Sequence, residues 1–344
     1  MSKTGLILSG GGARASYQVG VLRAVAEIVE DKQHNPFDVI SGTSAGGINA
    51  ASLACRSDDF GSAVERLWML WENLTSADVH RTGYRELLKA TLNLLFSFFS
   101  RGAPPSGRLF LLNNSPLRTL LQRTIDLERI DARIESGDIY ALGISALEYF
   151  SGNTIHFFQA HPDVEAWQRQ RRIGIRTRIT HAHLMASAAI PGIYSSVKIG
   201  RSHYGDGALR DTAPMSAALH MGADRLFVIG SSHNPRENGS MPPIESDHSP
   251  SVAQIISHLF NRSFLDTLEE DVERLERLNE VVERLSESDR EELGIKPVEV
   301  MCVIPGMRVD ELAARHFSSL PASLRTFFRT VGANGESGGA GVAS

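Results

Sequence analysis

The chain has 344 residues, of which 42% are hydrophobic and 22% are charged, so its composition excludes wholesale disorder and allows one large core or two smaller ones. Lys and Arg number 35 and Asp and Glu number 40, which gives a net charge of −5. This balance gives no support to a role in nucleic acid binding.

The chain opens with a strand, a glycine-rich loop and a helix. Residues 5–9 form a short apolar run, Gly10-Gly11-Gly12-Ala13-Arg14 follows, and apolar residues at helical spacing extend from Tyr17 to Val29. This order places loop N–H groups at the positive end of a helix, where either a phosphate or an oxyanion binds. No Gly-Lys-Ser/Thr sequence closes a P-loop. Ala15 replaces the third glycine of a dinucleotide fingerprint, although Glu30 lies near its acidic position.

A second glycine-rich element, Gly42-Thr43-Ser44-Ala45-Gly46, follows the apolar run that ends at Ile40. A G-x-S-x-G sequence at a strand end places its serine on a sharp turn, with the hydroxyl raised above the sheet. Ser44 is therefore the candidate nucleophile. The flanking glycines let the backbone double back and let a substrate carbonyl approach.

Acyl transfer needs a nucleophile together with donors that face the oxyanion, and the two elements supply both. Both follow short strands, whose carboxyl ends converge on one crevice in an open parallel sheet. We expect the amides of Gly10, Gly11 and Gly12 to be the oxyanion donors. Arg14, in the first helical turn, either adds positive charge there or is simply solvated.

A serine nucleophile also needs a base, and 12 histidines make a Ser-His-Asp triad the ordinary expectation. The histidines that follow possible acids lie in no distinctive turn after a strand; they are His220, His233, His248, His258 and His316. Asp206 stands out instead, because it lies between Gly205 and Gly207 after the alternating stretch Tyr194–Ile199. An aspartate between glycines is also an ordinary turn residue.

Four blocks in this order resemble the signature blocks of the patatin-like phospholipase family: 10–14, 42–46, Ala186-Ser187-Ala188-Ala189-Ile190-Pro191 and Asp206-Gly207-Ala208. The resemblance covers about residues 5–230, and Ala15 departs from the glycine usual in the family. It implies a serine acyl hydrolase with a Ser44–Asp206 dyad, no catalytic histidine and no cofactor or metal. It also implies an oxyanion hole at Gly10, Gly11, Gly12 and Arg14. Phospholipid or lysophospholipid is the implied substrate.

The remaining pattern predicts an α/β fold with three layers, a doubly wound and mainly parallel central sheet, and helices on both faces. We expect a catalytic domain over 4–230, with a helical cap over 57–137 that includes Val64–Trp71, Leu87–Phe99 and Leu117–Ile134. Further strands are predicted at Tyr140–Leu147, Thr154–Gln159, Ile173–Ile179, Tyr194–Ile199 and Arg225–Ile229. Residues 232–250 form a loop or linker, 251–330 a helical extension with one further strand, and 331–344 a disordered tail.

Two helical segments allow more than one interpretation. Leu87–Phe99 is apolar around most of its circumference, so it is either a buried core helix or a cap that contacts acyl chains or a lipid surface. A stripe from Phe264 to Leu285 packs on its own domain or forms a seam with a second copy. His181-x-His183 lacks clustered acidic or cysteine partners, so we expect no metal there.

Cys55 and Cys302 lie far apart without metal-ligand spacing, which predicts reduced thiols. No apolar leader precedes the first strand and no run reaches the roughly 18 apolar residues of a membrane span. We therefore expect a cytoplasmic protein with peripheral membrane contact. The sequence favours a lipid acyl hydrolase; an acyltransferase with the same dyad and a non-hydrolytic nucleotide-binding regulatory protein stay open.

Overall fold

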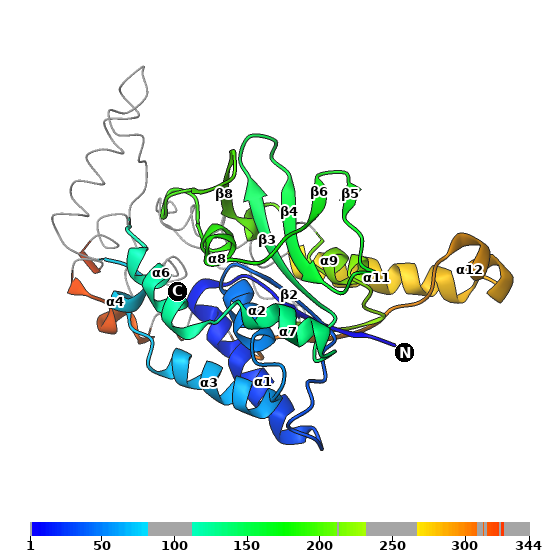
Figure 1. Ribbon diagram of the computed structural model, residues 1–344, viewed down its shortest axis with the longest axis horizontal. Coiled ribbons are helices and arrows are strands. Elements are labelled where there is room, and N and C mark those ends of the chain that lie inside the picture. Colours follow the sequence, from blue (N-terminus) through cyan, green and yellow to red (C-terminus); the bar gives the residue numbers. More distant parts are fainter. Residues whose placement is uncertain are drawn as a thin grey trace, which may run out of the picture.

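The computed structural model describes residues 2–81, 112–211, 213–231 and 267–307, together with 312, 315–322 and 325–326. In these residues a ten-stranded sheet forms the centre of the molecule (Figure 1). Its strands are β1 (Thr4–Leu8), β2 (Val39–Thr43), β3 (Ala141–Glu148), β4 (Thr154–Ala160), β5 (Trp167–Arg169), β6 (Arg172–Arg176), β7 (Val197–Ile199), β8 (Ser202–Asp206), β9 (Arg225–Ile229) and β10 (Glu299–Val303).

The strand order is β10-β9-β1-β2-β3-β4-β6-β5, and β10 to β3 are mutually parallel. Beyond β3 the sheet becomes mixed: β4 pairs antiparallel with β3, and β8 pairs antiparallel with the end of β3 and with β7. The chain order reverses between β1 and β9, as in a doubly wound sheet, whose ligand crevice lies beyond the carboxyl ends of the strands at the reversal.

Helices cover both faces of this sheet. The helices of the described residues are α1 (Ser16–Ile28), α2 (Ala45–Ala54), α3 (Phe60–Glu72), α4 (Ser76–Val79), α6 (Ser115–Thr124), α7 (Arg129–Glu135), α8 (His181–Ser187), α9 (Met215–His220), α11 (Thr267–Glu283) and α12 (Glu287–Leu293). The part of the chain that the structure describes also contains the short 3₁₀ turns η1 (Gly12–Ala15), η2 (Gly207–Leu209) and η5 (Phe317–Ser319).

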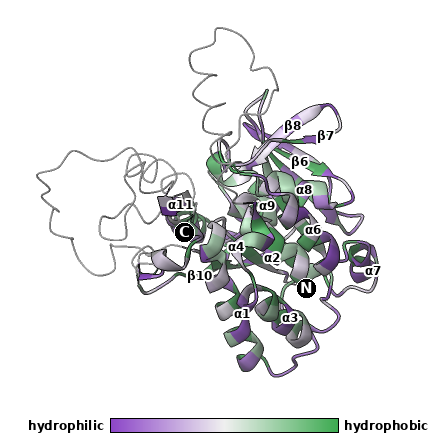
Figure 2. Ribbon diagram, turned by 90° about the vertical axis from the view of Figure 1, so that its left-hand side faces the viewer, coloured by the Kyte–Doolittle hydropathy of each residue, from purple (hydrophilic) through white to green (hydrophobic). Residues whose placement is uncertain are grey.

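Alternation along β1 shows how two cores arise. Leu6 and Leu8 lie in one buried cluster with α1, α2 and α3, whereas Ile7 lies in a second cluster with α9 and Leu268 of α11. Successive strand residues point to opposite faces, so each face has its own apolar layer. In Figure 2 hydrophilic residues predominate on α7 and β8 at the edge of this apolar interior. The predicted α/β architecture with helices on both faces of a central sheet is confirmed.

Two predicted elements differ from the structure. The single helix predicted over Leu117–Ile134 is wrong, because the chain leaves the helix at Ile125, which adopts extended angles of φ −116° and ψ 108°. Ile125 and Leu127 are buried in the break, so their apolar character serves the core without helical geometry. The strand predicted over Tyr194–Ile199 is confined to β7, and β8 supplies the second arm of a short hairpin.

The described helices between residues 57 and 137 pack on the sheet itself. Phe60 and Leu67 of α3, Leu121 of α6 and Ile130 of α7 are fully buried in the same cluster as Leu6 and Leu8. These helices thus form one outer layer of the fold. Residues 87–99, which carry the predicted apolar cap helix, lie outside the described residues.

The C-terminal helix α11 is only partly covered. Leu268 is buried and Val272 and Leu275 pack against the second core, whereas Leu278 and Val281 are 54% and 57% exposed. Of the predicted stripe, Leu268, Val272, Leu275 and also Val282 are therefore covered, whereas Leu278 is exposed. Figure 1 shows α12 extending away from the sheet beyond α11. Among the described residues no helix combines the length and apolar character needed to cross a bilayer.

Candidate active site

The sheet register explains how Ser44 and Asp206 meet across 162 positions of sequence. β2 pairs with the first part of β3 and ends with Thr43 opposite Ser145. β8 pairs with the next part of the same edge of β3, beginning with Asp206 opposite Ala146. The two strands therefore end next to each other along β3. This brings Ser44, the residue after β2, close to Asp206, the last residue of β8.

Ser44 occupies a strained turn at this location. Its backbone angles are φ 56° and ψ −129°, and only Arg171 joins it among described non-glycine residues with a positive φ. Such a conformation costs on the order of 1–3 kcal/mol and clusters at functional sites. A Cβ at Gly42 would overlap the carbonyl of Gly46, and a Cβ at Gly46 would overlap the carbonyl of Leu8. The two glycines therefore permit the turn and hold it against the end of β1.

The Ser44 hydroxyl donates a hydrogen bond of 2.6 Å to Oδ2 of Asp206. Both side chains are buried, with Asp206 fully inaccessible and Ser44 3% exposed. The other carboxylate oxygen, Oδ1, accepts from the N–H of Ala208 at 3.0 Å, which begins the η2 turn. Asp206 is thus both a turn residue, through Oδ1, and the hydrogen-bond partner of Ser44, through Oδ2.

Burial raises the pKa of Asp206 from 3.8 to about 7, because desolvation outweighs the opposing hydrogen bonds from Ser44 and Ala208. A solvated aspartate is nearly always ionised at neutral pH and is a weak proton acceptor. With a pKa near the operating pH, this carboxylate is much better matched to taking a proton from a hydroxyl. The pair therefore has the geometry and the electrostatics that base-assisted attack by Ser44 requires.

The glycines around Asp206 are needed for packing. A Cβ at Gly205 would overlap the phenol ring of Tyr149, and a Cβ at Gly207 would approach the carbonyl oxygen of Ser145 at 2.6 Å. The pKa of Tyr149 is raised, mainly because its phenol is partly buried and to a smaller extent because the charge of Asp206 is near. Tyr149, in the turn between β3 and β4, is therefore a neighbour of the carboxylate that sequence reasoning missed.

Ser187 lies in the third signature block, but sequence reasoning missed its role. Its fully buried hydroxyl accepts from the N–H of Ser44 at 2.8 Å and donates to the carbonyl of Ser145 at 2.6 Å. It thereby ties the strained turn of Ser44 to β3. The available signal was a serine within the run of small residues at 186–189, where a polar side chain destined for burial must find partners.

Ser187→Ala is expected to lower turnover by about 10² while leaving the fold intact, because a displaced nucleophile loses its attack geometry. The lost hydroxyl also leaves the Ser44 N–H and the Ser145 carbonyl without this partner, at a cost of about 1–3 kcal/mol. Esterase kinetics and thermal melting check this. Ser57→Ala is the matched control, since Ser57 is also buried and donates to a carbonyl, that of Ala54. Equal activity of the two variants would contradict the positioning role.

The glycine-rich loop lies beside this turn at the end of β1. A Cβ at Gly46 would also overlap the carbonyl of Ser9, and a Cβ at Gly11 would meet the side chain of Ser231. The Ser231 hydroxyl donates to the carbonyl of Gly10 at 2.6 Å. Gly12 has a φ of 56°, a left-handed value that glycine adopts without strain.

Within the described part of the chain, the N–H groups of Gly10, Gly11 and Gly12 make no hydrogen bond. They are available to an external acceptor at the start of η1. Arg14 follows in η1 with only 8% of its surface exposed, so the alternative of a simply solvated arginine is wrong.

A buried polar network fixes the loop to the helices below it. The side-chain amide of Gln18 donates to the carbonyl of Ser9 at 2.7 Å, and Asn49 donates to Gln18 at 2.9 Å and to the carbonyl of Ala15 at 3.1 Å. Trp71 completes the network with a 2.8 Å bond to Asn49. Gln18 and Asn49 are fully buried, and their place on otherwise apolar helix faces was the signal that could have revealed them.

Histidines have other roles in the described residues. None hydrogen-bonds to Ser44 or Asp206 there. His183 accepts from the N–H of Thr180 at 2.9 Å, and burial lowers its pKa to about 4. His181 contacts the carbonyl of Ile125 at 3.0 Å. His220 stacks on Trp167, His316 lies in the described C-terminal segment, and His233, His248 and His258 lie outside the described residues.

No group of three or more His, Cys, Asp or Glu side chains able to hold a metal occurs among the described residues. Cys55 is buried, and this burial raises the pKa of its thiol to about 12.

Comparison with known proteins identifies the family of this chain. The patatin-like phospholipase model matches residues 6–219, and the chain belongs to this family. The match contains the Gly10–Gly12 loop, the Ser44 turn and Asp206.

Individual relatives are more distant. A curated relative, the uncharacterized protein YjjU of Escherichia coli K12, is 26% identical over 225 residues, which is 65% of this chain and 50% of the relative. The solved structure of VipD from Legionella pneumophila is similar, with 15% identity and a TM-score of 0.39, and the match covers 69% of this chain and 52% of VipD. The solved structure of the type III effector ExoU of Pseudomonas aeruginosa is also similar, with 16% identity and a TM-score of 0.31, and the match covers 96% of this chain and 62% of ExoU. The chain spans about half the length of the curated relative that it matches.

Proposed function

We propose that this protein is a lipid acyl hydrolase that cleaves carboxylic esters through Ser44 and Asp206. The observation that carries the proposal is the 2.6 Å hydrogen bond between Ser44 and Asp206, made in a buried site. Burial of that site raises the pKa of the carboxyl to about 7. Membership of the patatin-like phospholipase family supports the lipid class of substrate.

The proposed reaction has two halves. Ser44 Oγ attacks the ester carbonyl carbon while Asp206 takes the hydroxyl proton, and the oxyanion binds the N–H groups of Gly10, Gly11 and Gly12. Collapse breaks the ester bond, and Asp206 returns the proton to the leaving alcohol. Asp206 then takes a proton from water, which attacks the acyl-enzyme and releases the fatty acid, and the proton finally returns to Ser44. Buried Arg14 adds positive charge near the oxyanion in this proposal.

Phospholipid or lysophospholipid in mixed micelles tests this function, with released fatty acid measured by mass spectrometry and Ser44→Ala as the control. Stoichiometric release of fatty acid and lyso- or deacylated lipid is expected, because water accepts the acyl group. Addition of glycerol distinguishes the acyltransferase alternative, since an acyl-glycerol product would then replace free acid. Absence of both products from every lipid offered would contradict the proposal and favour a non-hydrolytic role for the loop, such as nucleotide binding.

Three related statements stay predictions. A catalytic domain over residues 4–230 agrees with the range of the family match. Peripheral membrane contact through residues 87–99 concerns a segment outside the described residues. Self-association through residues 264–285 is supported by the exposed Leu278 and Val281 of α11.

A further inference from the structure

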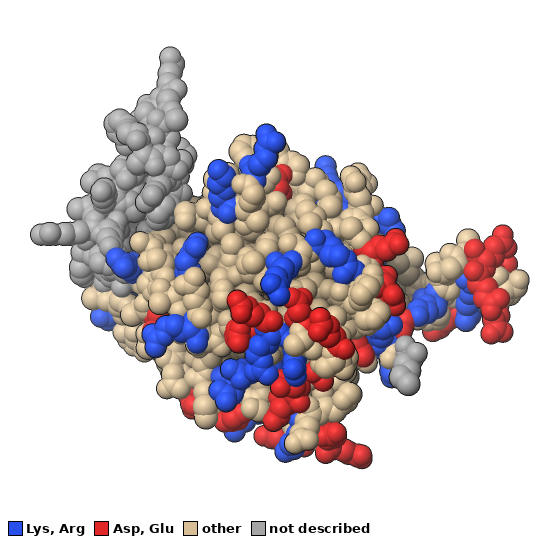
Figure 3. All heavy atoms as spheres, in the orientation of Figure 1, with Lys and Arg blue, Asp and Glu red and all other residues tan. Residues whose placement is uncertain are grey.

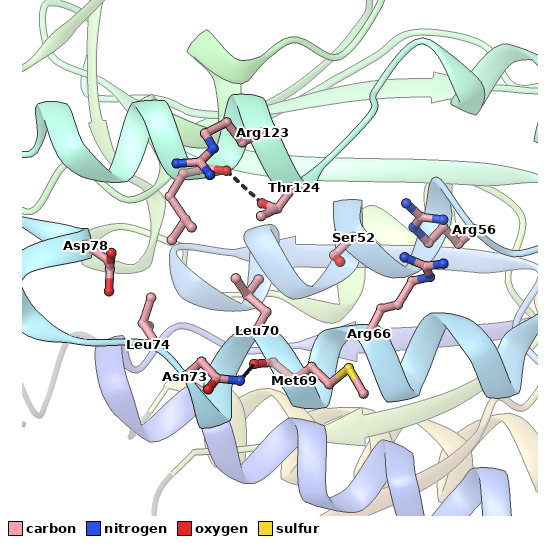
Figure 4. A pocket seen from close by; sticks show the side chains of 11 residues that line it. Ser52, Arg56, Arg66, Met69, Leu70, Asn73, Leu74, Asp78, Arg123 and Thr124 are labelled. Atoms are coloured by element: carbon pink, nitrogen blue, oxygen red, sulfur yellow. Dashed lines mark hydrogen bonds between the residues drawn. The ribbon is translucent and has the colours of Figure 1, made fainter.

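A surface pocket of about 450 Å³ lies between α3 and α6, at the far end of α2 from Ser44. Figure 4 shows Arg56 and Arg66 reaching into one end of it and Arg123 extending from the facing helix. Ser52 of α2 lines the pocket and lies eight residues after Ser44, which is about 12 Å along the helix axis at 1.5 Å per residue. A ligand here would not occupy the Ser44–Asp206 site.

The three arginines make no hydrogen bond or ion pair through their side chains within the described residues. Neighbouring arginines on α7 are paired: Arg129 lies 2.9 Å from Asp58, and Arg133 lies 3.0 Å from both Asp58 and Asp138. Figure 3 shows this interleaving of acidic and basic residues over α7. Asp58 thus pairs with α7 and forms no ion pair with Arg56, two residues away.

The acidic residue that lines the pocket is already engaged. Asp78 accepts hydrogen bonds from the N–H of Thr75 at 2.9 Å and from its hydroxyl at 2.6 Å, which cap α4. The hydrogen bonds from Thr75 are the main cause that lowers the pKa of Asp78, and the charge of Arg123 contributes least, without an ion pair between the two side chains. The pocket therefore concentrates unpaired positive charge in a chain whose net charge is −5.

Apolar side chains lie beside the arginines in this pocket, together with the polar side chains of Ser52, Asn73 and Thr124. Leu70 and Leu74 of the α3 side and Leu120 of α6 line it, and Met69 is 53% exposed at its rim. Guanidinium groups match phosphate oxygens through paired N–H donors, and an apolar strip beside them suits a hydrocarbon chain. The combination selects an amphiphile over a simple ion, because each part of the pocket has a complementary part in such a ligand.

We propose that this pocket binds a phosphate group that carries an alkyl or acyl chain. The phosphate binds Arg56 and Arg66, Arg123 adds positive charge from the facing helix α6, and the chain lies on Leu70 and Leu74. Arg56 and Arg123 lie near the carboxyl ends of α2 and α6, where a cation also favours the helix dipole. Helix-end stabilisation alone does not explain the position of Arg66, because Arg66 lies in the middle of α3.

The test is a calorimetric titration of the full chain with octyl phosphate, which has no carboxylic ester to cleave. Arg66→Gln/Arg123→Gln is expected to weaken binding at least tenfold, since both side chains are exposed and their loss removes charge without opening the core. Arg118→Gln is the matched control, because Arg118 is exposed on the same helix α6 and does not line the pocket. It is expected to bind like the wild type.

Two further titrations identify what is recognised. Inorganic phosphate should compete weakly and octyl glucoside should not bind, because each has only one of the two parts. Sedimentation with vesicles of phosphatidylcholine, with and without phosphatidic acid, then separates a membrane-embedded source of the phosphate from a free one. Equal affinity of wild type, Arg118→Gln and the double variant for octyl phosphate would overturn the proposal. This outcome is independent of ester hydrolysis, which the double variant should retain.

Discussion

Ser44→Ala and Asp206→Asn are each expected to reduce hydrolysis of a short-chain nitrophenyl ester by about 10⁴-fold or more, as is usual when a nucleophile or its acid–base partner is removed. Alanine removes the attacking oxygen. Asparagine keeps the shape of the side chain and its ability to accept from the N–H of Ala208, but it cannot take the proton of Ser44. The Asp206 variant therefore separates the chemical role of the carboxylate from its structural role in the η2 turn.

Asp211→Asn is the matched control for this experiment. Asp211 is a buried aspartate five positions along the same connection, and it makes no hydrogen bond through its carboxylate within the described residues. It should retain most of the activity. Replacement of any single histidine should do the same. A histidine variant that loses as much activity as Asp206→Asn would return the mechanism to a Ser-His-Asp triad.

The activity is expected to fall on acidification with an apparent pKa of about 7, because only the ionised form of Asp206 can accept a proton. Below that value kcat/KM should drop about tenfold per pH unit, and above it kcat/KM should level off. A stopped assay with a neutral ester, whose own ionisation does not change, measures this profile. An apparent pKa near 4 in this profile would indicate a solvated carboxylate, and it would contradict the proposed effect of burial on Asp206.

The same ionisation acts on stability in the opposite direction. The folded pKa of Asp206 lies above the unfolded value, so the folded state binds more protons between about pH 4 and pH 7. Its contribution to stability is therefore fully present at low pH and is lost as pH rises through about 7. Chemical denaturation should show Asp206→Asn gaining stability relative to the wild type over that range, by a few kcal/mol in total. A pH-independent difference would mean that the carboxyl stays ionised throughout.

The local elements of the site were predictable because short sequences determine them. Gly42 and Gly46 around Ser44 specify a turn that a Cβ would block, and the loop at Gly10–Gly12 follows an apolar strand. The proximity of Ser44 and Asp206 was predicted through the family resemblance. Its physical basis lies in strand register, since β2 and β8 share one edge of β3, and register between distant strands cannot be determined from either segment alone.

Residues that act through buried partners were not predictable in this way. Ser187 and Gln18 look like ordinary polar residues in sequence, and only their burial against Ser44 and Ser9 gives them a role. Likewise the break at Ile125 is invisible to apolar periodicity, because a buried residue in an extended segment has the same composition as one in a helix. The unpaired arginines near α3 needed knowledge of which carboxylates are already engaged.

Labelling with a fluorophosphonate, followed by peptide mass spectrometry, tests the central claim most directly, because this reagent modifies only an activated serine. We expect one adduct per chain, located on Ser44, with labelling that slows strongly in Asp206→Asn and below pH 7. An adduct on a different serine, or Ser44 labelled at the wild-type rate in Asp206→Asn, would contradict it.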